Sequence, residues 1–192
     1  NEITQLLRET KLSSGAFKNA YLGYKQLKKE NSLTNDSLIT IIDYGKPSNE
    51  ERFFIIDIKK MVLVQKSLVA HGQNSGEIMA ESFSNTMHSH KSSLGLFITT
   101  DTYMGKHGYS LRLKGIDKGL NDNALERAIV IHGAKYVSES YIQQNGRIGR
   151  SYGCPALPDN IAPEVIDLIK GGSCLYIYHP AIEVNSLQMA QI

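Results

Sequence analysis

Apolar side chains recur with the spacing of an α-helix near the start of the chain. Between residues 13 and 30 they lie three or four positions apart, and Ser13 and Ser14 are suitable N-caps. The lysines of this segment fall largely on its other faces, which is typical of a solvated surface. A shorter helix is expected over residues 3–12, so the pattern predicts a helical N-terminal segment over residues 1–35 that packs on the rest of the chain. The apolar positions of the longer helix are Phe17, Ala20, Tyr21, Tyr24 and Leu27.

From residue 38 onward the pattern changes to short β-branched and aromatic runs. Residues 53–58 and 61–64 predict a hairpin, and one late helix is expected over residues 163–169. Few helices separate the strands, so we expect a mainly β (α+β) domain over residues 36–192 and not a βαβ array. The other expected strands are residues 38–44, 67–71, 95–99, 108–113, 128–132 and 174–178, and the long polar loops are residues 72–93, 114–124 and 143–161.

Composition narrows the class of protein. A chain of 192 residues suits one domain, and its formal net charge of +2 lacks the basic excess of a nucleic-acid-binding protein. No apolar stretch approaches the roughly 18 residues of a membrane span. We therefore expect a globular domain with no nucleic-acid partner and no membrane span. The chain begins at Asn1 without Met or a targeting segment, which fits either a removed export signal or a shortened chain.

The two cysteines have different surroundings. Cys174 lies in an apolar run that predicts a strand, where a small buried hydrophobic residue is expected. Cys154 lies between Gly153 and Pro155 in a polar, glycine-rich loop, which suits an exposed reactive thiol. Two cysteines are too few for a disulfide framework, and we expect these two to be unbridged.

A histidine precedes the reactive cysteine by 22 positions, because His132 ends the apolar run over residues 128–132. A thiol needs a nearby base to become a nucleophile at neutral pH, and imidazole suits that task. Glycines beside the thiol allow main-chain N–H groups to approach a reacting carbonyl oxygen, as an oxyanion hole requires. The spacing alone is also consistent with an unconnected pair in an ordinary loop.

The motif His132-Gly133, followed by Arg150-Ser151-Tyr152-Gly153-Cys154, resembles the His-Gly … Ser-x-Gly-Cys signature of the L,D-transpeptidase catalytic-domain (YkuD-like) family. Residues 92–97 resemble the strand entry of that family. Residues 69–72, 83–85 and 105–111 resemble its murein L,D-transpeptidase branch. The resemblance extends over residues 38–178 and leaves the helical N-terminal segment outside it.

This resemblance implies a YkuD-like fold and cysteine acyl transfer on peptidoglycan stem peptides, without a cofactor, in an exported, periplasmic protein. Cys154 would be the nucleophile and His132 its base. The thioester would release D-alanine and pass to an amine, giving a 3–3 cross-link, or to water. The backbone N–H of Cys154, with those of Gly153 and Tyr152, would hold the developing oxyanion, and Ser151 and Gly133 are the other backbone residues implied around it.

The chain departs from the common family pattern after the cysteine, where Pro155-Ala156 stands in place of an apolar residue followed by Arg or Asn. Arg150 would replace that charge and bind a substrate carboxylate, or it would form a structural salt bridge; both interpretations remain open. His107 is expected to line the cleft. Tyr109 is a cleft hydroxyl or a packed strand residue, and the role of His71 is open.

Two alternative functions remain. One is a zinc-dependent peptidoglycan hydrolase that uses His71, His107 and His132, although the sequence contains no strong metal signature and no metal site is predicted. The other is a non-catalytic peptidoglycan-binding module with the same fold.

Overall fold

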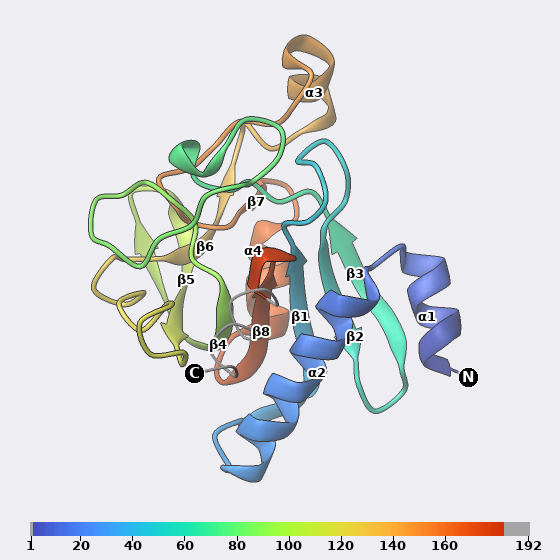
Figure 1. Cartoon of the computed structure of the whole chain (residues 1–192). Helices are drawn as coiled ribbons and strands as arrows, with labels where there is room; N and C mark the ends of the chain where they lie inside the picture. Colours follow the sequence, from blue (N-terminus) through green and yellow to red (C-terminus); the bar gives the residue numbers. More distant parts are fainter. Residues whose placement is uncertain (1, 183–192) are drawn as a thin grey trace.

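The structure is a computed structural model that describes residues 2–182. Within these residues eight strands form one mixed sheet in the order β3-β2-β1-β8-β4-β5-β6-β7 (Figure 1). Hydrogen-bonded neighbours are antiparallel except for the parallel pairs β1–β8 and β6–β7. The strands are β1 (Asn35–Asp43), β2 (Phe53–Asp57), β3 (Val62–Ser67), β4 (Gly95–Gly105), β5 (Gly108–Gly115), β6 (Val130–Ala134), β7 (Ala156–Pro158) and β8 (Ser173–Tyr178). The helices are α1 (Glu2–Thr10), α2 (Ser14–Lys29), α3 (Glu139–Asn145) and α4 (Ala162–Ile169), with a 3-10 turn η1 (Gln73–Ser75).

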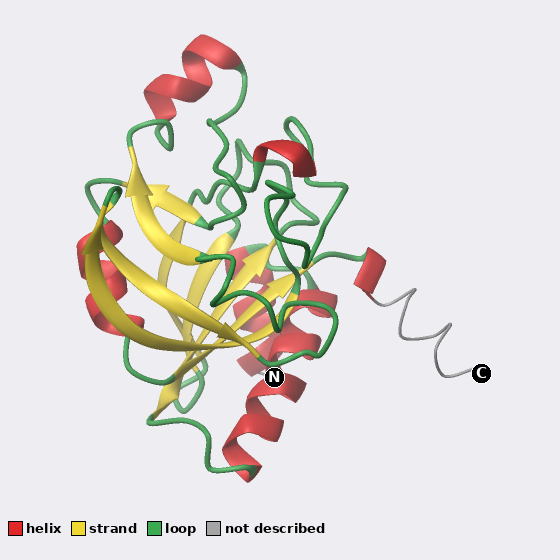
Figure 2. Cartoon of the chain, turned by 90° about the vertical axis from the view of Figure 1, so that its left-hand side faces the viewer, coloured by secondary structure: helices red, strands yellow, loops and turns green. Residues whose placement is uncertain are grey.

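The sheet curves into a barrel-like shape with helices on both faces (Figure 2). Helix α4 packs against one face, where Val165, Ile166 and Ile169 join the larger apolar core. Helices α1 and α2 cover the other face over β1, β2 and β8. The mixed α+β class is confirmed, because strands dominate and the helices cover the sheet instead of alternating with its strands.

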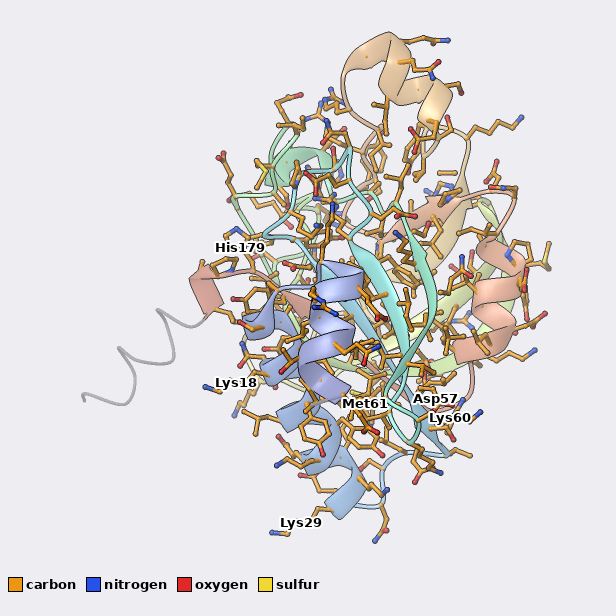
Figure 3. All side chains as sticks on the ribbon, turned by 90° about the vertical axis from the view of Figure 1, so that its right-hand side faces the viewer. Lys18, Lys29, Asp57, Lys60, Met61 and His179 are labelled. Carbon is orange, nitrogen blue, oxygen red and sulfur yellow. The ribbon has the colours of Figure 1, made fainter. Side chains whose placement is uncertain are left out.

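Helix α2 forms as its sequence pattern predicts. The Ser13 hydroxyl accepts the Ala16 N–H at 3.2 Å, which caps the first turn. The predicted apolar face is buried on the sheet, whereas Lys18 and Lys29 extend outward from the opposite side (Figure 3). The lysines of this helix therefore form a solvated face.

Replacing Leu27 of α2 with alanine should lower the free energy of unfolding by about 2–5 kcal/mol, because a fully packed side chain is removed from the interface with the sheet. Leu22 lies on the same helix but is 50% exposed, so Leu22→Ala should stay within about 0.5 kcal/mol of the parent. Denaturant unfolding measures both values. A separate early unfolding transition in Leu27→Ala would contradict the view that α2 and the sheet unfold as one cooperative unit. The domain boundary between residues 35 and 36 stays a prediction.

Most expected elements are present. The hairpin of β2 and β3 is antiparallel, and its tip carries Asp57, Lys60 and Met61 (Figure 3). The expected strand over residues 67–71 is wrong: β3 ends at Ser67, and beyond it Ala70 makes only an isolated bridge. The Val69 carbonyl in this segment accepts two hydrogen bonds from the buried Arg52 guanidinium instead of a strand partner.

The expected loop over residues 143–161 contains structure that the pattern did not indicate. It includes the end of α3 and the short strand β7, which pairs in parallel with β6. Three residues give no periodic signal, so β7 exists only because β6 lies beside it. Within residues 2–182 no helix has the length and apolar character needed to cross a bilayer.

Candidate active site

His132 and Cys154 line the same pocket, which has a volume of about 470 Å³. The turn between β4 and β5, the entry to β6 and the loop before β7 form its walls. Cys154 is partly exposed, while Cys174 is fully buried in β8, and both are free thiols as predicted. Six of the residues singled out from the sequence line this pocket: His107, His132, Arg150, Ser151, Tyr152 and Cys154.

His132 is held in one orientation by its own strand. It lies on β6 opposite Ser110 of β5 and Ala156 of β7, with only 2% of its surface exposed. Its Nδ1 lies 2.8 Å from the Gly133 carbonyl oxygen, which can only accept, so Nδ1 carries the proton. The Nε2 atom of the neutral ring is therefore unprotonated and able to accept a proton. Gly133 thus contributes its carbonyl to orienting the histidine.

A second imidazole covers the first. The His107 ring stacks on the His132 ring with centroids 4.3 Å apart and an interplanar angle of 15°. Burial is the main cause that lowers the pKa of His132, and the charges of His107 and Lys106 add to it. Burial and Lys106 also lower the pKa of His107. Both rings are therefore neutral at neutral pH.

The Cys154 thiol lies against the entry to β6. Its Sγ is 3.5 Å from the Val130 nitrogen, which donates to it, and 3.5 Å from the Ala128 carbonyl oxygen. Val130 and His132 share one face of the strand because they are two positions apart. Burial raises the pKa of the thiol, and the Val130 N–H and the charges of Arg127 and Lys106 oppose this rise only in part. The resting pair is therefore a neutral thiol and a neutral imidazole.

The Ser151 hydroxyl shapes the loop that carries the thiol. It accepts the Gly153 N–H at 3.1 Å and donates to the Cys154 carbonyl at 2.6 Å. Gly153 has a φ of +120°, and a Cβ there would lie 2.8 Å from the Lys91 carbonyl oxygen, so only glycine fits. The Gly153 amide is thus engaged within the loop, whereas the amides of Tyr152 and Cys154 have no acceptor among residues 2–182.

Neighbouring segments clamp the same loop from two sides. On one side the Ser151 amide donates to the His71 carbonyl at 3.0 Å. On the other side Tyr152 stacks on His90 with ring centroids 4.3 Å apart, and His90 in turn lies 3.2 Å from the Gln73 amide. Because both sides are held, the main chain around the thiol is preorganised.

Comparison with known proteins decides the family. The sequence profile of the L,D-transpeptidase catalytic domain matches residues 8–178 of this chain. The chain belongs to this family. Among curated proteins no match was found.

Solved L,D-transpeptidases show a distant likeness. An L,D-transpeptidase from Mycobacterium smegmatis is 12% identical, with 74% of this chain and 59% of that chain covered and a TM-score of 0.45. L,D-transpeptidase 3 from Mycobacterium tuberculosis is 10% identical, with 74% and 61% covered and a TM-score of 0.46. One from Xylanimonas cellulosilytica is 15% identical, with 74% and 60% covered and a TM-score of 0.43. This chain thus spans about three fifths of the length of these proteins.

Arg150 of this L,D-transpeptidase domain makes the structural salt bridge that was one of its two interpretations. Its Nη1 atom donates to Glu77 at 2.8 Å and to the carbonyls of Gln73 and Gly76. Arg147 binds the other oxygen of the same carboxylate. Arg150 still lines the pocket, but its charge is met by Glu77.

Two candidate residues lie elsewhere. The Tyr109 hydroxyl donates to Asp167 of α4 at 2.8 Å, so this tyrosine bonds to α4 and does not line the pocket. His71 is fully buried; its Nδ1 lies 2.8 Å from an Arg52 nitrogen and its Nε2 3.1 Å from the Gly76 carbonyl. Among the residues described, no three His, Cys, Asp or Glu side chains are grouped to hold a metal ion, so the three-histidine zinc site is not formed.

The L,D-transpeptidase pocket also contains residues that the sequence analysis did not select, notably Arg127 and Lys106. Lys106 immediately precedes His107 in the turn between two strands, and Arg127 precedes the run that leads into β6. The signal in the sequence that could have selected them is a charged residue close to the end of a predicted strand. That signal alone does not distinguish a pocket residue from a solvated one.

The raised pKa of Cys154 predicts how thiol alkylation depends on pH. A group with a raised pKa holds less thiolate at neutral pH than an ordinary cysteine does, so alkylation by iodoacetamide should be slower than that of a small free thiol. The rate should then keep rising at alkaline pH after the small thiol has reached its plateau. Mass spectrometry of the labelled chain measures this, with Cys154→Ala as the background. A plateau already reached at neutral pH would contradict it.

Proposed function

We propose that this domain transfers the acyl group of a peptidoglycan stem peptide through a thioester on Cys154. The observation that carries the proposal is that His132, with its Nδ1 proton held by Gly133, lines the same pocket as the thiol. Membership of the L,D-transpeptidase catalytic domain family supplies the reaction class. Acyl transfer needs a nucleophile, a base and an oxyanion site, and each has a candidate here.

In the first half-reaction the thiol attacks the carbonyl carbon between the third stem residue and the terminal D-alanine. The thiol proton passes to Nε2 of His132 as the Sγ–C bond forms, because the resting pair is neutral. His132 then gives this proton to the departing amine nitrogen, the C–N bond breaks and D-alanine leaves. The third residue remains as a thioester on Cys154.

In the second half-reaction an acceptor attacks the thioester carbon. An amine of a neighbouring stem loses a proton to His132, the C–S bond breaks and the thiolate recovers a proton, which gives a 3–3 cross-link. Water in the same position gives a shortened stem and an L,D-carboxypeptidase. Since peptidoglycan lies outside the cytoplasmic membrane, this function goes with an exported, periplasmic protein.

The oxyanion of both tetrahedral intermediates would be bound by the amides of Tyr152 and Cys154. Their lack of an acceptor among the described residues supports this assignment, as does the clamping of the loop by Ser151 and His90. Preorganised donors of this kind are worth about 3 kcal/mol each in related acyl-transfer sites. Of the three amides expected to bind the oxyanion, that of Gly153 is left out of this scheme because it already donates to the Ser151 hydroxyl.

The test is incubation with a disaccharide-tetrapeptide, with products followed by mass. Loss of D-alanine with a 3–3 dimer identifies a transpeptidase, and loss without a dimer identifies a carboxypeptidase. If the parent shows no turnover at any enzyme concentration, and both the parent and Cys154→Ala bind sacculi, the protein is a non-catalytic binding module and the proposal is overturned.

A further inference from the structure

The pocket around Cys154 is lined by cations without a matching carboxylate. Lys106, Arg127 and Arg150 line it, and no Asp or Glu does. Asp159 does not line the pocket; it lies against Gly133, and its charge partly opposes the lowering of the His132 pKa. Arg150 shares the Glu77 carboxylate with Arg147, whereas Lys106 and Arg127 have no ion pair with any described carboxylate.

Arg127 is a fixed positive charge. Its guanidinium donates to two backbone carbonyls, Ser84 and Lys91, and to the hydroxyls of Ser89 and Ser93. All four acceptors are neutral, and within residues 2–182 no carboxylate forms an ion pair with it. An arginine stays protonated in such a setting, so the hydrogen bonds orient its charge without cancelling it.

Lys106 supplies a second positive charge to the same pocket, on a flexible side chain. It lies in the turn between β4 and β5 next to His107, is exposed, and also has no ion-pair partner in the described part of the chain. Its charge reaches both His132 and Cys154. Because the four Nη hydrogens of Arg127 are already donated, the Lys106 ammonium would supply hydrogen bonds to a ligand carboxylate and Arg127 would attract it mainly through its charge.

We propose that Lys106 and Arg127 form a carboxylate subsite that selects anionic acyl donors beside Cys154. The identity of the acyl donor rests on the proposed function, whereas the positive charge of the pocket rests on its lining residues alone. A stem peptide can present a carboxylate on its terminal D-alanine or on the side chain of its third residue. These two groups are both carboxylates, so donors that lack one or the other are needed to distinguish them.

The charge of the pocket is tested without any peptidoglycan. Iodoacetate and iodoacetamide both alkylate Cys154 by forming a C–S bond and expelling iodide, and they differ in charge. The ratio of their rate constants, iodoacetate over iodoacetamide, should be at least about threefold higher for Cys154 than for N-acetylcysteinamide, a thiol with no other charge, in the same buffer. Added salt should reduce this excess. Cys174 is fully buried and contributes no background in the folded protein.

Variants assign the effect to the subsite. Lys106→Gln should lower the ratio toward that of N-acetylcysteinamide, and Lys106→Arg should retain it. Lys114→Gln, which changes an exposed lysine outside the pocket on β5, is the matched control and should leave the ratio unchanged. Any change in the thiol pKa affects both reagents equally and cancels in the ratio. A ratio equal to that of the free thiol, or one insensitive to Lys106→Gln, would overturn the subsite.

Three donors then identify the carboxylate: the free tetrapeptide, its terminal carboxamide, and the peptide amidated on the third side chain. The donor that lacks the recognised carboxylate should show a kcat/KM about tenfold lower, and this preference should disappear in Lys106→Gln. Equal turnover of all three donors would overturn the subsite while leaving the acyl transfer intact. No turnover of any donor, with the alkylation ratio still raised, would overturn the proposed function and support the anion site alone.

Discussion

Cys154→Ala should lower the release of D-alanine from a tetrapeptide stem by on the order of 10³-fold or more, because the thiol on which the acyl-enzyme forms is removed and no second thiol lines the described pocket. The Ser151 hydroxyl, three positions before the thiol, is bonded to the Cys154 carbonyl and the Gly153 amide. Intact-mass analysis should show an adduct of the stem peptide on the parent chain and none on the variant.

Cys174→Ala is the matched control for this experiment. Cys174 is the other thiol of the chain, but it is fully buried in β8 beneath α2. Its removal should cost about 1 kcal/mol of stability and leave turnover unchanged. If Cys154→Ala retained turnover while its thermal unfolding matched that of the parent, the thioester mechanism would be wrong.

His132→Gln should lower kcat by about 10²–10⁴-fold, because the amide of glutamine cannot accept the thiol proton. The pH profile gives a second readout. The parent needs neutral His132, and burial lowers the pKa of this ring, so activity should fall with decreasing pH only below the range of an ordinary histidine. This acidic limb should be absent in the residual activity of His132→Gln.

His107→Gln separates the base from the ring that covers it. The charge of His107 lowers the pKa of His132, and the His107 ring stacks on the His132 ring and helps to bury it. Replacing His107 should therefore raise the pKa of His132 and move the acidic limb to higher pH. The loss in kcat should be smaller than that of His132→Gln. Equal losses in the two variants, with an unchanged limb in both, would show that neither imidazole is the base.

The sequence predicted the candidate site through a local motif. Residues 150–154 are contiguous, so glycine, hydroxyl and thiol could be assigned to one loop, and His132 followed from its place at the end of an apolar run. Residues far from this motif were less predictable. Tyr109 was a candidate because of the segment around it, yet its hydroxyl bonds Asp167 of α4. The sequence analysis did not select Arg127, because its sequence neighbours give no sign that its guanidinium would bond to four neutral acceptors from residues 84–93.

By itself the sequence determined the elements whose periodicity records a buried face: helix α2, helix α4, the hairpin of β2 and β3, and the strands around them. It also predicted Cys154 as the nucleophile and His132 as its base, and these assignments stay predictions. Periodicity reports that a face is buried but not which distant segment covers it. Only the strand order, with β6 between β5 and β7, decided that Lys106 and Arg127 share a pocket with Cys154, and that His71 is buried outside it.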